Sequence, residues 1–146
     1  MATPFVTKER QRREQLWDQL DSRANPDDAP PRLLAELRVY RGQAGAWTDL
    51  SNTTYETAPH GVTVSVMLTG RLNDDELRLD GVTYHVPATQ RRGRAEAETA
   101  ATKRAMELGL PVFVITQGIT SKGRQVRRGT ITGYDESAQS FEIRFQ

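Results

Sequence analysis

Residues 61–94 bring an aromatic side chain, a pair of acids and several cations into one short stretch of chain. Tyr84 lies in the segment VTYHV, the acids Asp74 and Asp75 precede it, and Arg91 and Arg92 follow it. A pocket for a base turned out of a duplex uses these groups: an aromatic face for stacking, an acceptor for an exocyclic amine, and cations for the phosphates. The stretch therefore predicts a base-binding site.

Each side chain also has an ordinary structural interpretation. A strand aromatic such as Tyr84 normally packs in the core, and an acidic run such as Asp74-Asp75-Glu76 is normally a solvated turn, although it could hold a divalent cation. Lys and Arg side chains are most often solvated surface charge. The base-binding interpretation therefore depends on whether other motifs accompany these residues.

Groups that activate a nucleophile or hold a catalytic metal are scarce. The sequence has two histidines, His60 and His85, and no cysteine, which excludes disulfides, thiolate metal sites and cysteine nucleophiles. It contains neither a Gly-x-Ser-x-Gly motif nor a phosphate loop with its lysine. We therefore expect a binding protein rather than an enzyme, with no catalytic residue, metal or cofactor.

The charge is unevenly distributed along a chain whose net charge is only +1. Residues 89–128 hold nine Lys or Arg against three acids, whereas residues 49–80 hold two against six. Such polarisation favours one basic face that meets a polyanion. The N-terminus has no apolar signal stretch and no run is long enough to span a membrane, so we expect a cytoplasmic protein with no membrane partner.

Hydrophobic periodicity predicts an α+β domain. Residues 7–23 predict a peripheral helix, residues 94–108 a helix that ends at Gly109, and RLLAELRVY a short helical turn after the prolines at 30 and 31. Residues 62–69 alternate, with Val62, Val64 and Val66 on one face, and residues 82–86, 111–116 and the hairpin formed by QVRRGTITGY and SFEIRF predict further strands. We expect a small curved β-sheet or barrel with one central helix, residues 1–30 as an N-terminal helical arm and residues 31–146 as the domain.

Several motifs recur in the order found in the SET-and-RING-associated (SRA) domain, a PUA-like domain that reads modified cytosine in DNA. The motifs are Val39-Tyr40-Arg41, Gly45-Ala46-Trp47, Val64-Ser65-Val66 leading to Thr69-Gly70-Arg71, the acids Asp74-Asp75, Thr83-Tyr84-His85, and Gly93-Arg94. The resemblance covers about residues 38–145. The sequence resembles in particular the short SRA-like domains that precede HNH nucleases in bacterial modification-dependent restriction proteins.

The resemblance implies roles for particular residues. Tyr84 would stack on the flipped base, Asp75 would accept from the cytosine amine, and the backbone at Thr69 and Gly70 would approach the base. The family's second stacking tyrosine falls at a leucine here, so we expect Trp47 to cover the other side of the base. The predicted base pocket is Tyr84, Asp75, Asp74, Thr69, Gly70, Trp47, His85 and Ser65.

The expected partner is double-stranded DNA with 5-methylcytosine or a related 5-modified cytosine, with a nuclease domain or subunit as a further candidate partner. Candidate DNA contacts are Arg41, Arg71, Gln90, Arg91, Arg92, Arg94, Lys122, Arg124, Arg127 and Arg128. Two alternatives stay open: a PUA-like RNA-binding module, and a glycosylase or hydrolase in which Asp74 or Asp75 activates water.

Overall fold

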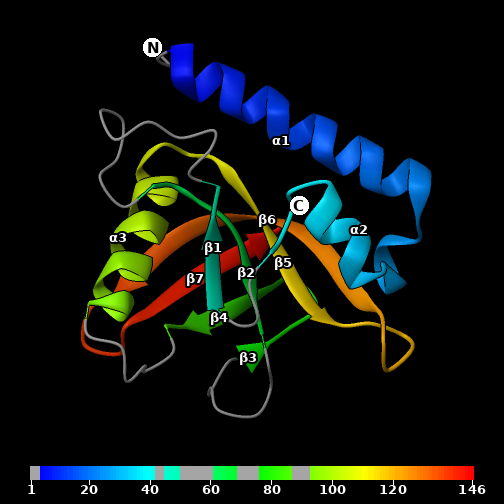
Figure 1. Ribbon diagram of the computed structural model, residues 1–146. Coiled ribbons are helices and arrows are strands. Elements are labelled where there is room, and N and C mark those ends of the chain that lie inside the picture. The colour runs from blue at the N-terminus through cyan, green and yellow to red at the C-terminus, as the bar shows by residue number, and fades with distance from the viewer. Residues whose placement is uncertain (1–3, 42–44, 50–60, 69–75, 87–92) are drawn as a thin grey trace.

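The computed structural model describes residues 4–41, 45–49, 61–68, 76–86 and 93–146 (Figure 1). It has the predicted α+β class. Its elements are α1 (Pro4–Arg23), the 3-10 turn η1 (Pro26–Asp28), α2 (Pro31–Glu36), β1 (Gly45–Thr48), β2 (Thr63–Met67), β3 (Glu76–Leu77), β4 (Gly81–His85), α3 (Arg94–Glu107), β5 (Pro111–Gln117), β6 (Arg124–Asp135) and β7 (Ser140–Phe145). Among the described residues, no helix is both long and apolar enough to cross a membrane.

One curved sheet organises the molecule, in the strand order β1-β2-β5-β6-β7-β4-β3 (Figure 1). Strands β2 and β5 are parallel, and the other neighbouring pairs are antiparallel. The order ends at β1 and β3, so within the described ranges the sheet is open. The prediction of a curved sheet is confirmed, whereas the barrel alternative is not.

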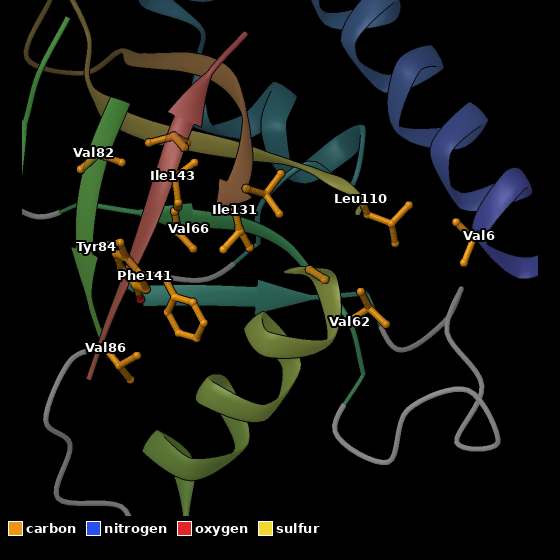
Figure 2. Packing of buried hydrophobic residues seen from close by; sticks show 13 residues of the cluster. Val6, Val62, Val66, Val82, Tyr84, Val86, Leu110, Ile131, Phe141 and Ile143 are labelled. Carbon is orange, nitrogen blue, oxygen red and sulfur yellow. The ribbon is translucent and has the colours of Figure 1, made fainter. Parts of the chain in front are cut away.

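Two buried clusters form the hydrophobic core. The first core joins α3 to the sheet and contains, among others, Val62, Val66, Val82, Tyr84, Ala105, Val114, Phe141 and Ile143. The second core joins α1 and α2 to the sheet and contains, among others, Leu16, Leu20, Leu34, Val39, Val64, Phe113 and Ile115. Helix α1 also reaches the first core through Val6, which lies near Leu110 (Figure 2). Leu16 and Leu20 are buried in the second core, so the helix predicted for residues 7–23 packs against the sheet.

The alternation predicted for residues 62–69 fails at Val64. Val62 and Val66 belong to the first core, but Val64 belongs to the second. The cause is a β-bulge: Trp47 pairs with Ser65 and Thr48 pairs with Thr63, so Val64 is an extra residue between them. A bulge shifts the register of the side chains by one and bends the strand, which turns Val64 toward the opposite face.

The elements with strong local signals are confirmed. Helix α3 ends beside Gly109, whose φ of +65° is the left-handed conformation that glycine adopts after a helix. The apolar run 111–116 is β5, and the predicted hairpin is β6 and β7. In the turn between them, the backbone N–H groups of Ser137 and Ala138 donate to the Asp135 carboxylate. This capped turn brings β7 back alongside β6.

Replacing Gly81 by alanine is expected to destabilise the fold by about 1–3 kcal/mol, because overpacking has costs of this size. A methyl group on Gly81 would overlap the carbonyl oxygen of Ile143 on the neighbouring strand β7. Urea denaturation of Gly81→Ala measures the loss. Gly133→Ala is the matched control, because no described atom lies within 4 Å of a methyl group added there. Equal midpoints for the two variants would contradict the prediction.

Candidate base-binding site

Several element ends meet around Gly45, the first residue of β1. Gly45 pairs with Met67 at the end of β2. A Cβ atom at Gly45 would lie 3.4 Å from the Tyr84 hydroxyl of β4 and 3.2 Å from both carboxylate oxygens of Glu98 of α3. We call Tyr40, Gly45, Tyr84, Arg94 and Glu98 the Gly45 cluster.

Glycine is required at position 45 for two reasons. Its φ of +76° is a conformation that other residues adopt at a cost. Its backbone is also approached from two sides, since the Tyr40 hydroxyl donates to its carbonyl oxygen at 3.3 Å while Tyr84 and Glu98 lie against its Cα. The absence of a side chain therefore lets three polar groups gather at the start of β1.

Glu98 is the most unusual member of the cluster. Its side chain is 11% exposed, Oε1 lies 3.4 Å from Arg94 Nε, and buried Oε2 has no hydrogen-bond partner among the described residues. Burial raises the pKa of Glu98, and Arg94 and the backbone of Ala46 oppose that change. Burial likewise raises the pKa of Tyr40, with a further contribution from Glu98. Relative to an exposed glutamate, the site favours a neutral carboxyl group, which both donates and accepts hydrogen bonds.

A Glu98→Gln variant is expected to lose a pH dependence that the native protein has. Because the native pKa is raised, the stability contributed by protonated Glu98 is present below the unfolded value of about 4.3 and is lost as pH rises above it. Glutamine keeps the shape of the neutral acid. The free energy of unfolding of the variant, relative to that of the native protein, should therefore increase as the pH rises from about 4 to about 7.

Urea denaturation across that pH range measures the effect. Glu96→Gln, an exposed position in the first turn of α3, is the control and should follow the native profile. Parallel profiles for native protein and Glu98→Gln would show that burial does not disfavour the Glu98 carboxylate.

Tyr84 is completely buried. Its exposed fraction is 0%, it pairs with Phe141 of β7, and Figure 2 shows the two rings beside each other in the first core. The ring packs against the sheet and α3, and its hydroxyl end reaches the Gly45 cluster. Stacking on a base stays a prediction, and it requires one face of this ring to become accessible.

Two other described pocket residues, Ser65 and Trp47, lie on the side of the second core. The Ser65 hydroxyl is buried and donates to the Val39 carbonyl oxygen at 2.7 Å, and half-buried Trp47 packs against the second core. The structure therefore does not bring Trp47 opposite the Tyr84 ring. His85 follows Tyr84 in β4 and is half-buried. Thr69, Gly70, Asp74 and Asp75 lie outside the described residues.

The described cations form separate groups. Arg41 and Arg124 line one cavity of about 140 Å³. Arg127 lies over the Phe145 ring and Arg128 over the Trp17 ring, at 4.9 and 4.6 Å, and both line a groove of about 440 Å³. The remaining candidates are exposed Arg94 beside Glu98, exposed Lys122 before β6, and Arg71, Gln90, Arg91 and Arg92, which lie outside the described residues.

Sequence reasoning missed Glu98 as a site residue. Arg94 and Glu98 stand four residues apart in α3, a spacing typical of an exposed helical ion pair. Only the approach of β1 and Tyr84 buries the carboxyl group. Gly45 itself was the available signal, since a glycine within a strand marks a site where another group approaches the backbone closely.

No known protein family matches the sequence, and no curated protein matches it. One solved structure with a similar fold is described as "Modification dependent TagI restriction endonuclease", with a TM-score of 0.54, 18% identity, and coverage of 81% of this chain and 47% of that chain. A second, "crystal structure of KRYPTONITE in complex with mCHG DNA and SAH", has a TM-score of 0.42, 15% identity, and coverage of 97% and 42%. The chain thus shares a fold with about half of the TagI structure.

Proposed function

We propose that the chain binds duplex DNA containing 5-methylcytosine or a related 5-modified cytosine, and that the modified base flips into a pocket beside the Gly45 cluster. The geometry that supports this is the meeting of β2, β4 and α3 at Gly45. In the sequence, the segment with the predicted acid pair follows Leu68 and precedes β3, and the Gly-Arg loop lies between Val86 and α3. On this proposal both segments border the pocket.

The chemistry of the proposed pocket selects cytosine. A carboxylate at Asp75 accepts from the N4 amine of cytosine, whereas thymine presents a carbonyl oxygen at the same position. Stacking on Tyr84 contributes about 1–3 kcal/mol in systems of this kind and does not depend on the base. On this proposal, Asp75 determines the specificity for cytosine, and the Tyr84 ring contributes affinity.

The shared fold with part of TagI adds support for a restriction context. On this proposal the chain is the specificity module, and the nuclease activity belongs to a domain or subunit outside residues 1–146. The pairs Arg41 with Arg124 and Arg127 with Arg128 hold DNA phosphates, a contact that positions a protein without reading sequence. The chain itself carries out no covalent step.

The proposal predicts at least tenfold tighter binding to a duplex with 5-methylcytosine than to the same unmodified duplex, a difference of about 1.4 kcal/mol. A gel-shift panel at one fixed salt concentration compares duplexes that contain cytosine, 5-methylcytosine, 5-hydroxymethylcytosine or phosphorothioate. Equal affinities across the panel would reject it. Tighter binding to a structured RNA would favour the RNA-binding alternative, and base release or cleavage after prolonged incubation would favour an enzyme.

Two variants sharpen this experiment. Asp75→Asn keeps the size of the side chain and removes the purely accepting carboxylate, so it should lose most of the preference for modified cytosine. Asp80→Asn changes an exposed acid in the turn before β4 and is the matched control. An Asp75→Asn protein with full discrimination would remove Asp75 from the pocket.

A further inference from the structure

A second polar cavity, separate from the proposed base pocket, lies between α1 and the start of β5. Its volume is about 140 Å³, many times the space of one water. Arg10, Arg13 and Arg128 line it, and Glu14 is the acid that lines it with them. The lining side chains thus carry a formal charge of +2, which is unusual for a recess that includes a buried side chain.

Arg13 is a buried cation with an unused donor. The residue is 1% exposed, Nε donates to Glu9 at 2.8 Å, and Nη1 donates to the Pro111 carbonyl oxygen at 2.7 Å. Its Nη2 is buried and has no hydrogen-bond partner in the part of the chain that the structure describes. Leaving a buried charged donor unsatisfied is costly. An acceptor in the cavity would remove that cost.

The other two guanidinium groups are also available to an anion. Arg10 Nη2 donates only to the Gly109 carbonyl oxygen, at 3.3 Å, and Arg128 lies over the Trp17 ring. Neither forms an ion pair within the described ranges. Glu9 is the counter-ion of Arg13 but leaves its Nη2 without a partner, and Arg10 and Arg128 have no such counter-ion among the described residues. Guanidinium groups bind the oxygens of phosphate in a bidentate geometry.

We infer that this cavity is an anion site for a phosphate group, held by Arg10, Arg13 and Arg128. A phosphate group suits three guanidinium groups better than a carboxylate does, because it presents more acceptor oxygens. The site is distinct from the Gly45 cluster: Pro111 begins β5, whereas Gly45 pairs with Met67, which pairs with Ile115 further along that strand. The inference does not depend on the base pocket.

Thermal unfolding in sodium phosphate and in sodium chloride of equal ionic strength tests the site, with inorganic phosphate as the probe. Phosphate at ten times its Kd should raise Tm by about 3–6 °C above chloride. Arg10→Gln and Arg128→Gln should each lose that difference. Arg32→Gln, at an exposed position of α2 outside the cavity, is the matched control and should keep it. Equal Tm values in the two salts, or a difference that survives both cavity variants, would overturn the inference.

Unmodified duplex DNA distinguishes the two sources of a phosphate group. If the DNA backbone occupies the site, Arg10→Gln should weaken binding to the unmodified and modified duplexes equally and reduce the slope of log K against log salt by about 0.9. If a free phosphate compound occupies it, Arg10→Gln should leave DNA affinity unchanged while the phosphate-specific rise in Tm disappears. In neither case should Arg10→Gln remove only the preference for modified over unmodified duplex. A native protein that shows no such preference would therefore reject the proposed function without affecting the test of the anion site.

Discussion

Replacing Tyr84 by alanine is expected to lower the free energy of unfolding by about 3–5 kcal/mol, as truncation of large core aromatics does. The ring is 0% exposed and packs with Phe141 and Ile143 in the first core, so the variant would leave a cavity between β4, β7 and α3. Urea denaturation followed by circular dichroism measures the loss. An unchanged unfolding midpoint would show that the ring is not part of the core.

Tyr84→Phe is the control that separates packing from the hydroxyl group. It keeps the ring and removes only the hydroxyl at the Gly45 cluster, so we expect a loss of about 1 kcal/mol. If the ring also stacks on a flipped base, Tyr84→Phe should retain the preference for modified duplex. A stable Tyr84→Phe protein without that preference would assign recognition to the hydroxyl group rather than to the ring.

Replacing Glu9 by alanine is expected to cost about 3–5 kcal/mol, because it leaves a buried cation without its counter-ion. Glu9 is buried, and its carboxylate accepts from Arg13, which is also buried, and from Arg12. Arg13 Nη1 also donates a hydrogen bond to the Pro111 carbonyl oxygen, which connects α1 to the start of β5. The unfolding midpoint in urea measures the loss.

The double variant Glu9→Leu with Arg13→Met should recover most of that loss, since replacing a whole buried ion pair by apolar groups is often neutral or stabilising. Glu14→Ala, at an exposed position of α1, should change stability by less than about 0.5 kcal/mol. A Glu9→Ala protein as stable as Glu14→Ala would mean that Arg13 reaches water or another acid. The double variant should also abolish the phosphate-specific rise in Tm, which links this test to the anion site.

Local signals predicted most of the elements correctly. Helix α3 follows from a run of strong helix formers ended by Gly109, and the β6–β7 hairpin follows from turn residues whose own side chains cap the turn. The apolar run of β5 required no partner to be recognised as a buried strand. These features are stabilised by interactions between residues a few positions apart, so a short stretch of sequence is enough to predict them.

Side-chain direction was harder to predict, because it depends on the neighbouring strand. The bulge at Val64 exists only in relation to β1, and no pattern within residues 62–69 reveals it. Trp47 likewise packs on the face away from Tyr84, although the motif order placed both in one pocket. A shift of one residue in register exchanges the two faces of a strand, so an error in pairing misplaces whole side chains.

The sequence by itself determined the α+β class, the limits of α3 and the closing hairpin, and the order of motifs that predicts a reader of modified cytosine. Only the tertiary structure decided that Glu98 is buried beside Gly45 and that Arg13 is a buried cation rather than one of many surface arginines in α1. Both are charged residues in helices whose sequence is typical of a solvated surface. Their burial arises from contacts with β1 and β5, which are distant in the chain, and the desolvation of a charge is set by those contacts rather than by local sequence.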